Sequence, residues 1–100
     1  MDILLWGAGE KATIIYRCIN KQENNILGII DINRCKSEKS WVAYEGETIK
    51  LFAPEIVDEI QFDYIVVTPL NYEPIKNYIV SLGCDEEKII CFWKENCNIN

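Results

Sequence analysis

The stretch ILLWGAGEKA, residues 3–12, decides how this chain folds. The apolar run Ile3 to Trp6 predicts a buried strand, and the Gly-Ala-Gly that follows it ends the strand in a turn. Beyond the turn, apolar residues recur three and four positions apart, as they do on one face of a helix, and we expect a helix from Glu10 to Lys21. The stretch therefore predicts a strand, a tight turn and a helix.

Small residues in this turn favour a ligand-binding role. Gly7 permits the tight turn, Gly9 lets a ligand approach bare backbone, and Ala12 lets helix and strand pack closely. A turn of this kind directs the N–H groups of the helix start at an anion. The residues that we expect to contact a phosphate-bearing ligand here are Gly7, Ala8, Gly9, Glu10 and Lys11.

Hydrophobic runs that alternate with helical patterns predict the rest of the fold. This alternation is typical of βαβ units in a parallel sheet that is covered on both faces. We expect an α/β fold of three layers with five parallel strands in the order 3-2-1-4-5, the third and weakest strand lying at an edge. The five predicted strands are Ile3–Trp6, Ile26–Ile30, Thr48–Phe52, Tyr64–Val67 and Ile89–Phe92.

The segments between the strands carry further signals. Pro54 suits the first turn of a short helix. A third helix is expected after Asn71, with Pro74 in its first turn and Gly83 at its end. The polar segment Asn33 to Glu47 lacks helical periodicity and is expected to form a mobile loop.

The predicted topology places a ligand where the first and fourth strands end. Asp31 ends the second strand about 20 residues beyond the turn, where an acidic residue meets a ribose hydroxyl in dinucleotide-binding folds, and it would favour NAD over NADP. An aspartate that only shapes a strand-end turn is the alternative. Likewise, Asn71 either contacts the ligand or caps a helix. The strand-end residues that we expect near the ligand are Asp31, Asn33, Thr68, Pro69, Leu70, Asn71 and Tyr72.

Glu10 argues against a full dinucleotide. A carboxylate in the first helical turn already occupies the positive end of the helix dipole and would repel a pyrophosphate, unless Lys11 folds back to offset it. The glycines would then only make a tight turn. Trp6, Trp41 and Trp93 are expected to pack in the core or anchor loops, and for Trp41, in the polar loop, stacking on a base is the alternative.

Composition limits the classes of function. The 100 residues, 49% of them hydrophobic, suffice for one packed domain, expected over residues 1–93 with a polar tail at 94–100. A net charge of −6 with scattered basic residues argues against nucleic-acid binding. The apolar runs are too short to cross a bilayer and no signal peptide is visible, so we expect a cytoplasmic protein.

The cysteine and histidine content bears on chemistry. Five cysteines without a CxxC pair, in a chain without histidine, argue against a zinc site and fit a reducing compartment, with Cys18 and Cys91 as core residues. Histidine is also the usual side chain for proton transfer near neutral pH. We therefore expect no complete catalytic machinery in this domain.

From Ile3 to Phe92 the layout resembles the small Rossmann-like domains at the N-termini of bacterial nucleotide-sugar acyltransferases and polysaccharide-biosynthesis dehydratases. The segments that carry the resemblance are ILLWGAGEKA, ILGIID, FDYIVVTP and SLGCDEEKII. Such domains also occur beside sugar methyltransferases and glycosyltransferases. The resemblance implies that Gly7, Ala8, Gly9 and Asp31 face a nucleotide or nucleotide-sugar. Glu10 departs from it, because a smaller or uncharged residue is common there.

Together these features predict a module that binds a nucleotide or nucleotide-sugar, with NAD as one candidate and no metal. It would serve cell-surface polysaccharide or sugar-nucleotide metabolism, within a longer enzyme or beside a catalytic partner protein. One alternative is a fragment of a sugar-nucleotide dehydratase or sugar methyltransferase. Another, which Glu10 favours, is a vestigial Rossmann domain with an unoccupied cleft that serves homodimerisation or protein interaction. Neither nucleic-acid binding nor membrane insertion is expected.

Overall fold

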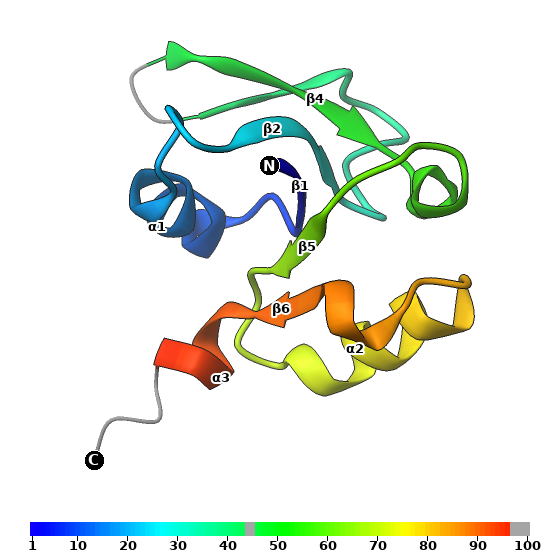
Figure 1. Ribbon diagram of the computed structural model, residues 1–100. Helices are drawn as coiled ribbons and strands as arrows, with labels where there is room; N and C mark the ends of the chain where they lie inside the picture. The colour runs from blue at the N-terminus through cyan, green and yellow to red at the C-terminus, as the bar shows by residue number, and fades with distance from the viewer. Residues whose placement is uncertain (44–45, 97–100) are drawn as a thin grey trace.

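One sheet lies between two helical layers in the computed structural model, which describes residues 1–43 and 46–96 (Figure 1). The elements in chain order are β1 (Asp2–Trp6), α1 (Glu10–Cys18), β2 (Asn25–Ile30), β3 (Ser40–Val42), β4 (Thr48–Phe52), the 3₁₀ helix η2 (Pro54–Asp58), β5 (Tyr64–Val67), α2 (Tyr72–Ser81), the 3₁₀ helix η3 (Glu86–Lys88), β6 (Ile89–Cys91) and α3 (Phe92–Asn96). The predicted α/β class is confirmed. In the part of the chain that is described, no helix is long and apolar enough to cross a membrane.

The sheet has six strands in the order β3-β4-β2-β1-β5-β6. The neighbouring strands along β4-β2-β1-β5-β6 pair in parallel, whereas β3 pairs antiparallel with β4. The prediction of five parallel strands in the order 3-2-1-4-5 is therefore wrong, because the sheet is mixed and has a sixth strand. Thr48–Phe52 is also not an edge strand, since β3 covers its outer side.

The additional strand lies within Asn33 to Glu47, which was expected to be a mobile loop. This strand, β3, has three residues, and its side chains alternate between exposed and buried only once: Trp41 is buried between two exposed neighbours. Trp41 packs edge-on against Tyr16 of α1, with ring centroids 6.0 Å apart. One buried indole thus anchors a strand that is too short to show a hydrophobic pattern. Residues 44–45 lie outside the described part of the segment.

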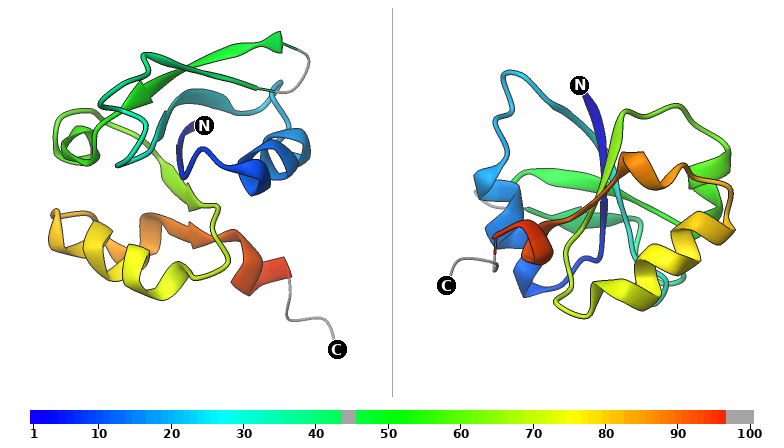
Figure 2. Two further views of the ribbon diagram at one scale, coloured as in Figure 1. Left: turned by 180° about the vertical axis from the view of Figure 1, so that it is seen from behind. Right: turned by 60° about the horizontal axis from the view of Figure 1, so that its bottom comes forward.

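Two apolar clusters fill the spaces on the two faces of the sheet. α1 and α3 cover one face, and η2 and α2 cover the other (Figure 2, right). Successive residues of a strand point to opposite faces, so β1 places Leu5 in the first cluster and Leu4 in the second, each without exposed surface. A central strand buried on both faces explains the unbroken apolar run that the sequence shows.

The first helix is shorter than predicted. It ends at Cys18, and the ammonium of Lys21 donates to the carbonyl oxygens of Tyr16 and Ile19, which helps to cap the helix end. Cys18 is exposed, so the prediction that it belongs to the core is wrong, whereas Cys91 is buried as predicted. The reason is helical phase, because the buried stripe passes through Tyr16 and Ile19 and leaves Cys18 beside it.

The predicted last strand, Ile89–Phe92, differs from the structure at its final residue. The last strand ends at Cys91, and Phe92 begins α3 instead of closing the strand. This helix continues to Asn96, into the segment expected to be a polar tail, of which residues 97–100 lie outside the described part.

Gly28 allows β2 to lie close to the ring of Phe52 on β4. A β-carbon at Gly28 would lie 2.6 Å from Phe52 Cδ2 and 3.0 Å from the Lys50 carbonyl oxygen. We expect Gly28→Ala to lower the free energy of unfolding by about 1–3 kcal/mol, because the ring or the strand must move. In a Phe52→Leu background the same substitution should cost less. Urea unfolding of the four proteins measures both costs, and equal costs would contradict this contact.

Candidate ligand-binding site

Three strands end at the same level on one edge of the sheet. Trp6, the last residue of β1, pairs with Ile30 of β2 on one side and with Val67 of β5 on the other. The chain segments that follow these strands line an open pocket of about 340 Å³. Its lining residues are Gly7, Ala8, Gly9, Glu10, Lys11, Asp31, Thr68 and Pro69.

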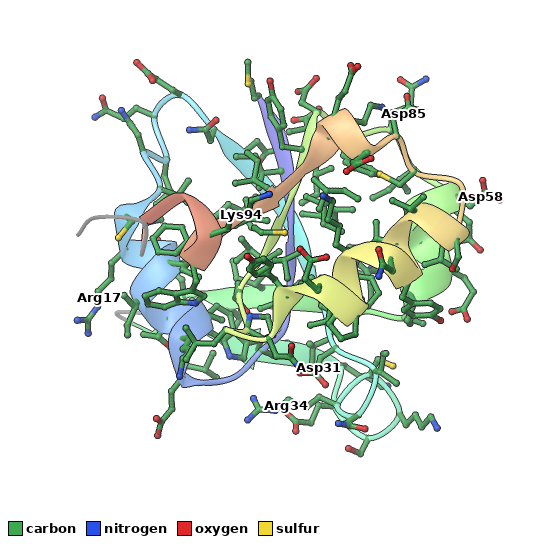
Figure 3. The ribbon with its side chains drawn as sticks, turned by 90° about the horizontal axis from the view of Figure 1, so that it is seen from below. Arg17, Asp31, Arg34, Asp58, Asp85 and Lys94 are labelled. Atoms are coloured by element: carbon green, nitrogen blue, oxygen red, sulfur yellow. The ribbon has the colours of Figure 1, made fainter. Side chains whose placement is uncertain are left out.

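Of the residues expected near the ligand, the pocket brings together the five of the glycine turn with Asp31, Thr68 and Pro69, whereas Asn33, Leu70, Asn71 and Tyr72 are not part of its lining. Asn33 is exposed, and its backbone N–H donates to Asp31. Figure 3 shows Asp31 and Arg34 at the same side of the molecule, while Asp58 and Asp85 lie well away from them. The carboxylates of Asp58 and Asp85 therefore have no part in this site.

Gly7 makes the tight turn after β1. Its φ of +100° is one that side-chain-bearing residues rarely adopt, and a β-carbon there would lie 2.6 Å from Thr68 Oγ1 and 3.1 Å from Pro69 Cδ. Its N–H donates to the carbonyl oxygen of Ile30 at 2.7 Å. Backbone freedom and close packing against the loop after β5 both require glycine at this position.

Gly9 differs, because nothing in the protein requires it to be glycine. It is the N-cap of α1 with a φ of −85°, and a β-carbon there would meet no atom within 4 Å. Across residues 1–43 and 46–96, no acceptor is found for the N–H groups of Gly9, Glu10 or Lys11. The bare backbone at the start of α1 thus presents unpaired donors beside the pocket.

Asp31 braces this turn from the end of β2. Its Oδ2 accepts the N–H of Ala8 at 3.0 Å, and its Oδ1 accepts the N–H groups of Asn33 and Arg34, each at 2.9 Å. The two bonds to Oδ1 shape the turn that follows β2, which was the alternative role considered for this residue. The bond to Ala8 ties that turn to the glycine turn.

Thr68 and Trp93 support the pocket from the other side. The Thr68 side chain is 2% exposed, and its hydroxyl donates to the carbonyl oxygen of Trp6 at 2.8 Å. The indole N–H of Trp93 on α3 donates to the carbonyl oxygen of Thr68. Sequence reasoning expected Trp93 to pack in the core or anchor a loop, but no pattern could identify Thr68 as the residue that it holds.

Other residues considered for the ligand lie elsewhere. Trp41 is in the core against Tyr16, so it is not available to stack on a base. Leu70 is exposed outside the pocket lining, and Tyr72 packs against the cluster beneath α2. Asn71 is the N-cap of α2, but its side chain makes no capping hydrogen bond.

The charges of the pocket are mixed. Among its lining residues, Glu10 and Asp31 are acidic and Lys11 is basic. The Arg34 guanidinium lies 4.0 Å from the carboxylate of Glu38, so its charge is partly compensated within its own turn. No group of three or more potential metal ligands occurs within the described part of the chain. The arrangement offers backbone donors, the carboxylates of Glu10 and Asp31 and the ammonium of Lys11, which are the means to hold a small polar ligand.

The brace can be tested by changing one atom of Asp31. In Asp31→Asn an amide oxygen can still accept from Asn33 and Arg34, but an NH₂ group then faces the N–H of Ala8. Because Ala8 is buried, its donor loses its acceptor, and we expect the free energy of unfolding to fall by about 1–3 kcal/mol.

Asn33→Ala is the matched control. Only its backbone N–H takes part in the turn, so we expect a change within about 0.5 kcal/mol. Urea unfolding monitored by circular dichroism measures both variants. A loss in Asp31→Asn no larger than that in Asn33→Ala would contradict the bracing role.

Comparison with known proteins gives a family and no activity. No curated protein matches the chain. The family model described as C2185-like, N-terminal, matches residues 1–90, a range that contains every residue lining the pocket. The chain therefore belongs to the C2185-like N-terminal domain family.

Proposed function

We propose that this domain binds a nucleotide or nucleotide-sugar, with a phosphate at the start of α1 and a ribose hydroxyl at Asp31. One observation carries the proposal: the residues whose N–H groups lack a partner in the described part of the chain line the same pocket as the carboxylate of Asp31, where β1, β2 and β5 end. Ligands of open parallel sheets bind at this edge, where neighbouring strands connect to opposite sides. The free N–H groups suit phosphate oxygens, and the carboxylate suits a hydroxyl.

Size and charge narrow the ligand. The volume of about 340 Å³ lies near the lower end of the roughly 300–1,000 Å³ of small-molecule sites, which favours a mononucleotide portion over a whole dinucleotide. Asp31 would repel a ribose 2′-phosphate, so NAD is a better candidate than NADP if a dinucleotide binds. The pocket residues support binding and supply no evident acid–base pair, so any chemistry would belong to a catalytic partner domain or protein.

We propose that the domain serves sugar-nucleotide or cell-surface polysaccharide metabolism in the bacterial cytoplasm. This part of the proposal rests on the sequence resemblance alone. The same pocket is also compatible with the alternative that this chain is a fragment of a sugar-nucleotide dehydratase or methyltransferase. The catalytic residues would then lie in another part of that enzyme.

A second candidate follows from Glu10. Its carboxylate stands in the first turn of α1, where it opposes an anion, as expected for a domain that has kept the fold and now mediates dimerisation or protein interaction. Calorimetric titration with ADP, GDP, CDP, UDP, NAD and UDP-glucose separates the two candidates. Binding of any of these supports the nucleotide module, and no heat at millimolar concentration of all of them favours the interaction domain.

Substitution of Gly9 tests where the phosphate lies. Its β-carbon position is open, so Gly9→Val should leave a folded domain, with a loss of up to about 1 kcal/mol because valine is a poor N-cap. The added bulk lies where the phosphate approaches the backbone, and we expect at least a tenfold loss of nucleotide affinity. Gly9→Ala should lose less. Unchanged affinity in Gly9→Val would remove the phosphate from this turn.

Substitution of Glu10 tests how much its carboxylate weakens the binding of a phosphate. Glu10→Gln should tighten binding of a nucleoside diphosphate by about 0.3–1 kcal/mol, more at low salt than at high salt, and should not affect the uncharged nucleoside. Glu73→Gln is the matched control, because it removes the same charge from the first turn of α2, outside the pocket. Equal effects on nucleotide and nucleoside would show that Glu10 acts through shape instead of charge.

A further inference from the structure

We infer that Asp31 accepts a hydrogen bond from only one of the two ribose hydroxyls of its ligand. The inference rests on the proposed function and specifies which hydrogen bonds that pocket can make to the ribose of a ribonucleotide. A carboxylate that is free of other partners can accept from both hydroxyls, whereas the bonds that Asp31 makes within the protein leave room for a single donor.

The acceptor capacity of the carboxylate sets this limit. An ionised carboxylate offers about four lone-pair positions, two on each oxygen. Oδ1 already accepts the N–H groups of Asn33 and Arg34, both at 2.9 Å, and is filled. Oδ2 accepts the N–H of Ala8 at 3.0 Å, which leaves one position on this oxygen. The remaining position is on the oxygen that is bonded to the glycine turn of the pocket.

The bond from Ala8 is not easily given up to a ligand. Ala8 is 1% exposed, so water has little access to replace the acceptor of its N–H. A hydroxyl that displaced this N–H would gain one hydrogen bond and leave a buried donor without a partner. The exchange has no net advantage, and the bond stays in place when ligand binds.

The two bonds to Oδ1 are held equally firmly by the turn that follows β2. The N–H of Cys35 donates to the carbonyl oxygen of Asp31 at 3.0 Å, and the N–H of Glu38 donates to that of Arg34 at 2.8 Å. Rotating the carboxylate to free Oδ1 would break the bonds from Asn33 and Arg34 together, and the bond from Ala8 to Oδ2 with them. A ligand hydroxyl cannot compensate for that loss.

The ligand class that follows is a ribonucleotide recognised through one hydroxyl, with the other left to solvent or to a sugar or partner group. Removing the hydroxyl that is read should weaken binding about tenfold or more, because a hydrogen bond to a charged acceptor is lost. Removing the other should change affinity by less than about twofold. The pocket should thus bind the 2′-deoxy and 3′-deoxy forms of the nucleotide with different affinities.

The test compares isomeric ligands on the intact wild-type chain. The diphosphate among ADP, GDP, CDP and UDP that binds most tightly is titrated beside its 2′-deoxy and 3′-deoxy forms, with calorimetry as the measurement. We expect one deoxy form to lose at least tenfold in affinity and the other to bind like the parent. In parallel, we expect the Ala8 amide in an ¹⁵N spectrum to exchange slowly both in the free protein and with the parent ligand bound.

Three results would overturn the inference while leaving nucleotide binding intact. A tenfold loss with both deoxy forms would mean that both hydroxyls are read, and no loss with either would mean that Asp31 only braces the fold. Rapid exchange of the Ala8 amide on binding would show that the ligand displaces the brace. If none of the four diphosphates binds, the proposed function itself fails, and this inference fails with it.

Discussion

The hydrogen bond from Ala8 to the carboxylate of Asp31 is the constraint on which the rest of the site depends. It joins the turn after β1 to the turn after β2, beyond the bond from the Gly7 N–H to the carbonyl oxygen of Ile30 at the end of β2. The same carboxylate organises the residues that follow it through Asn33 and Arg34. One side chain therefore sets the position of the glycine turn, the course of the chain after β2 and one wall of the pocket.

The opposite wall depends on close packing instead of charge. Gly7 allows Thr68 to approach a point where no β-carbon would fit, and the Thr68 hydroxyl bonds back to the end of β1. Trp93 then holds the Thr68 backbone from α3. The pocket is thus braced on both sides before a ligand arrives, and a site formed in advance spends little of its binding energy on ordering loops. This bracing would serve the ligand-binding role that we propose, because the pocket walls need not be ordered on binding.

The sequence predicted those features that repeat or stand in a fixed relation along the chain. The apolar runs gave the parallel strands, and the glycine turn with Asp31 gave the edge at which the pocket lies. The strand around Trp41 was missed because three residues cannot establish a period, and its partner Tyr16 is remote in sequence. The three hydrogen bonds of Asp31 were also beyond prediction, since the sequence contains the residue but not the number of N–H groups that surround it.

Magnitudes decide whether Glu10 prevents an anion from binding. An exposed charge at a helix start is worth about 0.3–1 kcal/mol and is screened by salt, whereas each hydrogen bond between a backbone N–H and a charged oxygen contributes about 1.5–3 kcal/mol. The N–H groups of Gly9, Glu10 and Lys11 can supply more than one such bond, and Lys11 adds a positive charge to the same lining. Glu10 is exposed, so its repulsion stays at the lower scale. For the phosphate that we propose at this turn, the carboxylate would therefore weaken binding without abolishing it, and it would select against ligands that place several negative charges there. A mononucleotide portion with its outer phosphate in solvent meets that condition better than a pyrophosphate enclosed between two nucleosides.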